Sequence, residues 1–80
     1  MATVLSDLAP GSVAVIRAIP NGEVFLRLRE MGLLPGTTVK LLRAAPSGDP
    51  LEIQMRGYNL SVRRVEAAAI EVEPASVGKS

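Results

Sequence analysis

The chain contains no cysteine, no histidine and no tryptophan, and its aromatic residues are Phe25 and Tyr58. Without cysteine it has no disulfide framework, thiolate zinc site, iron–sulfur cluster or cysteine nucleophile. Without histidine it lacks the commonest general base and the imidazole ligand that transition metals prefer. These absences exclude most catalytic classes, and we expect a protein that is not an enzyme.

Long apolar runs and a strong charge of one sign are also missing. Nowhere do 18 apolar residues follow one another, and residues 1–5 lack the basic segment of a secretory signal. Nine Lys and Arg against eight Asp and Glu leave a net charge of +1, which is too weak to indicate nucleic acid as the main partner. We expect a cytoplasmic protein that binds no nucleic acid and does not insert into a membrane.

The 80 residues are enough for one domain with a thin core, and 48% of them are apolar. We expect residues 1–74 to form that domain and residues 75–80 to be a flexible tail. With so few aromatic residues, the core must consist mainly of Val, Leu, Ile, Ala and Met. Such a core is typical of a small barrel or sandwich.

Short apolar segments separated by Gly and Pro predict strands over residues 12–19, 37–43 and 70–73. In the first of them Val13 and Val15 share one face and Ile16 falls on the other, so this strand is either bulged or covered on both sides. In the second, Val39 and Leu41 are expected to point inward. A short turn over residues 5–8 precedes them.

The clearest alternation lies on either side of Gly57-Tyr58, and it predicts a β-hairpin. Apolar residues alternate with polar ones from Leu51 to Arg56 and again from Leu60. If Gly57-Tyr58 form the turn, the buried pairs are Met55 with Leu60 and Ile53 with Val62, and Glu52 faces Arg63 outside.

Between the first two strands the apolar period becomes helical, over residues 23–31. At 100° per residue Val24, Leu28 and Met31 fall within about 60° of one another, with Phe25 at their edge, and we expect them to face the core. Asn21 is expected to cap the helix start, and Gly32 to close its end in a left-handed conformation. Pro35-Gly36 then predicts a type II turn.

The predicted fold is mainly β: a small, partly open, SH3-like barrel of about five strands. One amphipathic helix joins strands one and two, and a short helical turn over residues 64–69 precedes the last strand. We expect no catalytic residues, no cofactor and no metal-binding residues, because no carboxylates converge and Met31 and Met55 are assigned to the core. No glycine-rich segment has the spacing of a phosphate-binding loop.

One leucine departs from the helical pattern. Leu26 lies about 170° from the centre of the apolar face, between Arg29 and Glu30, where the helix should meet water. It is either a contact point for a partner or one of the single exposed leucines that are common on protein surfaces.

Residues 27–36, with the sequence RLREMGLLPG, resemble the helix-and-turn signature of FeoA domains. Other pieces of that family's pattern follow in the same order. They are Leu5-Ser6-Asp7-Leu8 with Pro10-Gly11, Gly48-Asp49-Pro50, Leu60-Ser61-Val62-Arg63-Arg64 and Ile70-Glu71-Val72. The resemblance covers residues 5–73, nearly the whole chain.

The resemblance implies a cytoplasmic accessory or regulatory protein of bacterial ferrous iron uptake that acts by protein–protein interaction. Its partner would be a FeoB-type membrane permease with a cytoplasmic GTPase domain, which would hold the iron pathway and the nucleotide site and would bring this protein to the inner face of the membrane. The family also implies transition-metal binding. In structural terms it implies Leu28 and Met31 as core, Gly32 as the helix stop and Pro35-Gly36 as the turn.

We therefore expect a partner-binding surface on the outer face of the helix, made by Leu26, Arg29 and Glu30, with Arg56 and Arg63 as further cations. It would contact the cytoplasmic domain of the permease or a second copy of this protein. Two alternatives stay open at this point, a small SH3-like nucleic-acid-binding module and a stand-alone metal-sensing domain.

Overall fold

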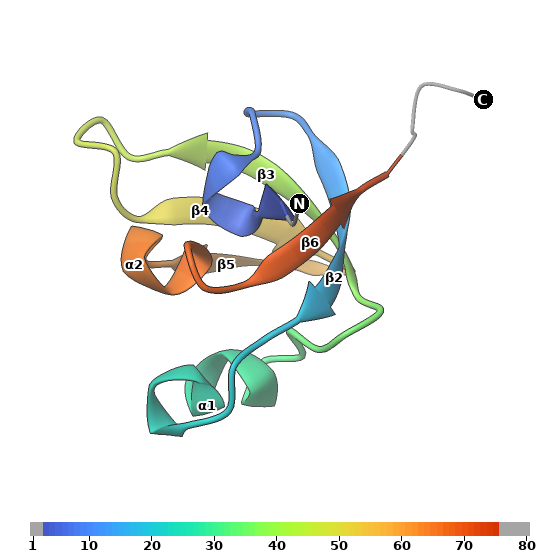
Figure 1. Cartoon of the computed structure of the whole chain (residues 1–80). Helices are drawn as coiled ribbons and strands as arrows, with labels where there is room; N and C mark the ends of the chain where they lie inside the picture. Colours follow the sequence, from blue (N-terminus) through green and yellow to red (C-terminus); the bar gives the residue numbers. More distant parts are fainter. Residues whose placement is uncertain (1–2, 76–80) are drawn as a thin grey trace.

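The computed structural model describes residues 3–75, which form one curved sheet with short helices at its margins (Figure 1). The strands are β1 (Thr3–Val4), β2 (Val13–Ala18), β3 (Thr38–Ala44), β4 (Leu51–Met55), β5 (Tyr58–Val62) and β6 (Glu71–Pro74). The helices are the 3-10 helix η1 (Leu5–Asp7), α1 (Glu23–Glu30) and α2 (Arg64–Ala67).

The six strands pair antiparallel in the order β1-β6-β2-β3-β4-β5, so β1 and β5 are the two edges of the sheet. The sheet curls around its core as a small, partly open, SH3-like barrel, which confirms the predicted fold class (Figure 1). The sixth strand, β1, was not predicted. It has two residues, too few to show an alternation, and it is held by its pairing with β6.

The core is aliphatic, as the composition predicts. Val39 and Leu41 of β3 point inward, as do Ile70 and Val72 around the start of β6. The turn predicted at residues 5–8 is η1, and its Leu5 is fully buried and donates its backbone N–H to the Ile70 carbonyl oxygen at 2.9 Å. The largest fully buried side chains are Leu5, Ile16, Leu28, Leu33, Leu51, Ile53, Ile70, Val39 and Val62.

Strand β2 resolves the ambiguity in its pattern. Ala14 and Ile16 are buried, whereas Val13 and Val15 are half-buried on the other face. The pairing of β2 with β6 shifts register between Ile16 and Ala18. The strand is therefore irregular at its end and partly covered on both faces.

The β4–β5 hairpin is present, but its predicted register is wrong. Met55 pairs with Tyr58, so Arg56-Gly57 form the turn, and Ile53 pairs with Leu60. The observed pairing is displaced by two residues from the predicted one. A displacement of two keeps every side chain on its predicted face, and Leu51, Ile53, Leu60 and Val62 are buried as expected. Gly57 has φ +88°, which a two-residue hairpin turn favours and only glycine adopts easily.

Outside the barrel, Glu52 pairs with Ser61 in the hairpin and not with Arg63. Its carboxylate instead accepts a bond from Arg43 of β3, with 3.2 Å between Nε and Oε1. The expected Glu52–Arg63 pair is thus replaced by a contact across β3 and β4.

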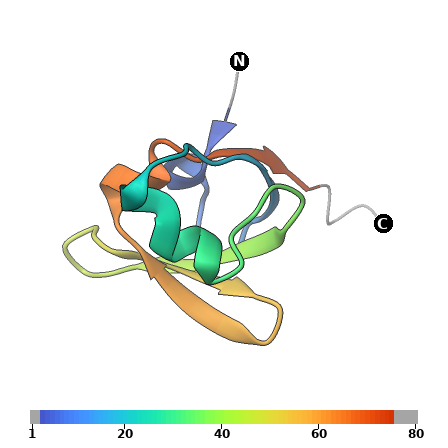
Figure 2. The same cartoon turned by 90° about the horizontal axis from the view of Figure 1, so that it is seen from below.

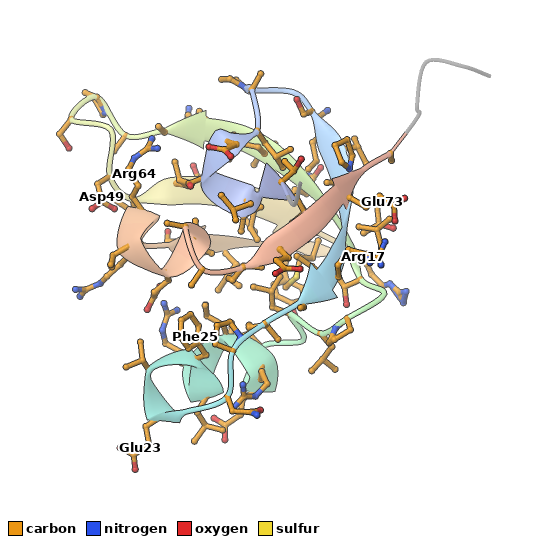
Figure 3. The ribbon with its side chains drawn as sticks, viewed as in Figure 1. Arg17, Glu23, Phe25, Asp49, Arg64 and Glu73 are labelled. Atoms are coloured by element: carbon orange, nitrogen blue, oxygen red, sulfur yellow. The ribbon has the colours of Figure 1, made fainter. Side chains whose placement is uncertain are left out.

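Helix α1 crosses the end of the barrel (Figure 2). Leu28 is the only fully buried residue of α1, and Phe25 packs against the core. Val24 is 65% exposed, and Met31, directly after the helix, is 40% exposed. Figure 3 shows Phe25 pointing from α1 toward the barrel and Glu23 pointing away. The expectation that Val24 and Met31 belong to the core is wrong, because a helix that crosses a barrel end presents only a narrow stripe to it.

The ends of α1 also differ in part from expectation. Gly22 is the N-cap and no side chain caps the helix start, so the predicted cap at Asn21 is wrong. The C-terminal end is as predicted: Gly32 has φ +101°, and Leu33 donates its N–H to the Leu28 carbonyl oxygen at 3.0 Å. The helix therefore stops at a glycine and places Leu33 in the core.

The Pro35-Gly36 turn is confirmed. Thr37 donates its backbone N–H to the Leu34 carbonyl oxygen at 3.0 Å, and Gly36 has φ +94° at the third position, as a type II turn requires. At the other end of the chain, most of the segment expected to be a tail, residues 76–80, lies outside the described residues. Within residues 3–75, no helix has the length and apolar character needed to cross a membrane.

Candidate partner-binding site

Hydrogen bonds hold both the end of helix α1 and the segment that leads into it. The Arg29 guanidinium folds back along the helix and donates to the Pro20 carbonyl oxygen at 2.5 Å and to the Gly22 carbonyl oxygen at 3.5 Å, which ties the helix to the segment before it. At the end of the helix, the Tyr58 hydroxyl of β5 donates to the Met31 carbonyl oxygen. This second bond connects the helix end to the barrel.

A third contact links α1 to α2. Arg27 of α1 approaches Glu66 of α2, with 3.4 Å between Nη2 and Oε1. The Glu66 side chain is only 9% exposed, and the same oxygen accepts the backbone N–H of Arg63 at 3.0 Å. One carboxylate thus closes the first turn of α2 and orients α1 beside it.

The outer face of α1 carries two of the predicted partner-binding residues. Leu26 is 45% exposed and Glu30 is exposed, so both are accessible from one side of the helix. Arg29 is half-buried, and its Nη1 and Nη2 donate to the carbonyl oxygens of Pro20 and Gly22 that precede the helix. We therefore assign Arg29 to positioning the helix more than to presenting a free charge.

The other two predicted residues come from different elements. Arg56 lies in the β4–β5 turn, and Arg63 lies directly before α2; both are exposed. The predicted set is therefore distributed over the helix, the hairpin turn and the α2 start, all of which belong to or adjoin the α1 end of the barrel.

A groove that sequence reasoning missed lies between the segment 32–38 and the β4–β5 hairpin. Its volume is about 1240 Å³, and Lys40 of β3 and Val13 of β2 also contribute to it. The apolar part of its lining is made by Leu34, Pro35, Val39, Met55 and Tyr58. Figure 2 shows the β4–β5 turn and the segment that follows α1 on the same side of the molecule.

One signal for this groove was present in the sequence. Leu33 and Leu34 lie between a helix stop and a Pro-Gly turn, where consecutive side chains point in different directions. Leu33 is fully buried and Leu34 is 45% exposed. The second leucine of this pair is therefore left at the surface beside the hairpin.

The charged side chains of the barrel wall are mostly paired. Arg17 and Glu73 approach to 2.6 Å between Nη1 and Oε1, and Figure 3 shows them side by side on β2 and β6. Arg64 donates its backbone N–H to Asp49 at 2.9 Å and its Nε to the Gly48 carbonyl oxygen at 2.8 Å, which ties α2 to the β3–β4 loop. Within residues 3–75, no three or more Asp or Glu side chains come together as a metal-binding group.

These features define the class of protein: a small SH3-like domain with an accessible helix face and an adjoining groove. The FeoA domain model matches residues 3–74, and the chain belongs to the FeoA domain family.

A curated relative from Porphyromonas gingivalis is a fusion of Fe(2+) transport protein A with the Fe(2+) transporter FeoB. It is 43% identical over 70 residues, which are 86% of this chain and 8% of the fusion protein. This chain therefore spans less than a tenth of that relative's length.

Two solved structures show the same fold. The FeoA protein of Chlorobium tepidum has a TM-score of 0.86 and 37% identity, with 92% of this chain and 71% of that chain covered. The FeoA of Stenotrophomonas maltophilia, solved with zinc, has a TM-score of 0.77 and 28% identity, with 90% of this chain and 91% of that chain covered. The latter is described as a prokaryotic SH3 domain protein and has been suggested as a ferrous iron transport activating factor.

Proposed function

We propose that this protein is a non-enzymatic accessory protein of bacterial ferrous iron uptake, and that it acts by binding the cytoplasmic GTPase domain of a FeoB-type permease. The observation that carries the proposal is the Porphyromonas gingivalis relative, in which a similar domain and FeoB are parts of one polypeptide. Fusion keeps two domains at a high effective concentration, and this is useful when they act on each other.

The chemistry of the chain supports a binding role. It has no histidine or cysteine to act as base, nucleophile or soft metal ligand. In this proposal ferrous ion is the cargo of the permease, and the nucleotide site belongs to the partner. The protein would work in the cytoplasm, at the inner face of the membrane through that partner.

For the contact surface we propose the outer face of α1. Leu26 supplies an exposed apolar anchor and Glu30 a neighbouring carboxylate, on a helix that Arg29 and Tyr58 hold in place. Arg56 and Arg63 would lie at the rim of the interface, where charges affect the association rate and its salt dependence more than the affinity. The Tyr58 bond at the helix end and the Arg27–Glu66 contact with α2 give such a surface a defined geometry.

The test is a calorimetric titration of this protein into the purified cytoplasmic domain of its cognate FeoB-type permease, with and without a GTP analogue and ferrous ion. We expect saturable binding. The titration should extend to roughly millimolar concentration, the range that a short tether supplies in a fusion. Absence of binding throughout this range would contradict the proposed contact with the GTPase domain.

Self-association is the competing use of the same surface. Sedimentation of the protein alone, over the same concentration range, distinguishes the two. A monomer that binds the permease domain supports the proposal, whereas a dimer that dissociates on Leu26→Asp and does not bind that domain contradicts it.

A further inference from the structure

The charged residues of the groove between segment 32–38 and the β4–β5 hairpin are all of one sign. Its lining includes the cations Lys40 and Arg56, together with polar residues such as Gln54 and Asn59, and no carboxylate. On the outer wall of the barrel, by contrast, Arg43 is paired with Glu52 and Arg17 with Glu73. A groove with two cations and no internal anion favours an occupant with negative charge.

The same groove presents apolar surface next to the cations. Leu34 and Tyr58 are 45% and 42% exposed, although both belong to well-defined turns or strands. The Tyr58 hydroxyl already donates to the Met31 carbonyl oxygen, so its remaining free surface is the apolar ring. An occupant therefore meets an apolar wall and a positive charge side by side.

One wall of the groove is the start of an edge strand. Tyr58 and Asn59 belong to β5, which pairs only with β4 among the strands of residues 3–75. In an antiparallel pair, alternate residues direct their backbone N–H and C=O away from the neighbouring strand. With Tyr58 opposite Met55 next to a two-residue turn, these outward groups fall on Asn59 and Ser61. An extended segment can use such groups, while a helix has satisfied its own.

We propose that this groove binds an extended segment of a partner protein in which an acidic side chain adjoins a large apolar one. The carboxylate lies against Lys40 and Arg56, and the apolar side chain lies against Leu34 and the Tyr58 ring. This inference does not rest on the proposed function. The groove shares Arg56 with the rim of the surface proposed for the permease, but its apolar contacts come from Leu34 and Tyr58, and it is tested without the permease.

The probes are two pools of fluorescein-labelled octapeptides with Gly and Ser at their ends. In the first pool Asp or Glu adjoins Leu, Ile or Phe at the centre, and in the second Lys or Arg replaces the acidic residue. Fluorescence anisotropy measures the binding of each pool to the full chain. We expect saturable binding of the acidic pool that weakens with added salt, and no saturation with the basic pool. Equal binding of the two pools, or binding of neither, overturns the proposal.

Matched variants identify the surface used. Leu34→Gln should weaken binding of the acidic pool about tenfold, as loss of a central apolar contact does. Lys40→Gln should weaken it about two- to fivefold, since one partly exposed charge pair contributes a modest amount. Arg43→Gln, on the same strand but outside the groove, is the control and should leave binding unchanged.

Amide chemical-shift mapping gives a readout that does not depend on any variant folding correctly. With the acidic pool, we expect the shifted amides to lie in segments 32–40 and 54–61. Shifts confined to α1, or concentration-dependent shifts without peptide that indicate a second copy in the groove, overturn the assignment. Displacement of the peptides by a single-stranded oligonucleotide at equal concentration also overturns the assignment. Lys40 and Arg56 would then bind phosphate groups and not a carboxylate.

Discussion

The hydroxyl of Tyr58 in β5 donates a hydrogen bond to the backbone carbonyl oxygen of Met31 at the end of α1, 27 residues earlier in the chain. It joins the edge strand of the sheet to the helix that crosses the barrel end. Tyr58→Phe removes the donor and keeps the ring. Because the residue is 42% exposed, we expect a loss of about 1 kcal/mol or less in the free energy of unfolding.

The local effect of Tyr58→Phe should exceed the global one. Amide hydrogen exchange at Leu33, whose N–H is bonded to the Leu28 carbonyl oxygen in the same helix end, is expected to accelerate in the variant. Unchanged exchange there and unchanged unfolding in urea would mean that this bond does not hold the helix end.

Gly32 is a position where a side chain would be costly for two reasons. Its φ is +101°, and a Cβ built on it would lie 3.0 Å from the Tyr58 hydroxyl oxygen. Gly36 has a similar φ of +94° with nothing within 4 Å, so Gly36→Ala serves as the control for backbone strain alone. We expect Gly36→Ala to cost about 1 to 2 kcal/mol and Gly32→Ala more, measured by chemical unfolding.

Coupling between the two positions provides a check on that explanation. In the double variant Gly32→Ala with Tyr58→Phe, the oxygen that opposes the new methyl group is gone. The two effects on unfolding free energy should then sum to more than the effect of the double variant. Strict additivity would indicate that the close approach contributes nothing.

The rotation of α1 can be tested by two truncations on one helix. Leu28 is fully buried and Val24 is 65% exposed, although the helical period places both on one apolar face. We expect Leu28→Ala to cost about 2 to 5 kcal/mol and Val24→Ala less than about 0.5 kcal/mol. Urea unfolding measures both losses. Equal losses of unfolding free energy for the two variants would mean that Val24 and Leu28 both face the core, as the sequence predicts.

That helix shows where sequence reasoning succeeds and where it stops. Periodicity predicts that residues 23–31 are helical, and Gly32 marks the end, because these are local properties of the chain. Which of the apolar residues points inward depends on how the helix meets the barrel. In the structure Phe25 and Leu28 face the barrel. Their mean direction is rotated by about 60° around the helix axis from the centre of the predicted apolar face, and no local sequence pattern specifies that rotation.

The hairpin illustrates the same division. Alternation predicts both strands and both faces correctly, yet the turn lies at Arg56-Gly57, one residue earlier than expected. A displacement of two in register keeps the faces and changes the partners, so the buried pattern cannot distinguish the two pairings. The groove escaped prediction for a related reason: Leu34 and Tyr58 come together only when the helix stop and the hairpin are placed in space.

Glu66 is the one buried charged side chain among residues 3–75, and its role predicts a graded response to substitution. Its Oε1 accepts the Arg63 backbone N–H and approaches Arg27. Glu66→Ala leaves that N–H without its acceptor, and we expect a loss of about 1 to 2 kcal/mol. Glu66→Gln keeps an acceptor and loses only the charge, so thermal unfolding should show a clearly smaller decrease. An equal decrease in thermal stability for both variants would mean that Glu66 stabilises the fold through its ion pair with Arg27 and not through the bond to the Arg63 N–H.

Leu26 and Leu34 allow the two proposed binding surfaces to be separated, because each is 45% exposed and neither is needed for the core. If the permease domain contacts the outer face of α1, Leu26→Asp should weaken the complex about tenfold or more, since it places a carboxylate at an apolar anchor. Leu34→Asp should leave that affinity within about twofold, because its side chain lies in the groove. Calorimetry with each variant, after circular dichroism shows that both fold, decides between them. Loss of permease binding in Leu34→Asp alone would move the contact from the helix face to the groove, and loss in neither would remove both surfaces from the interface.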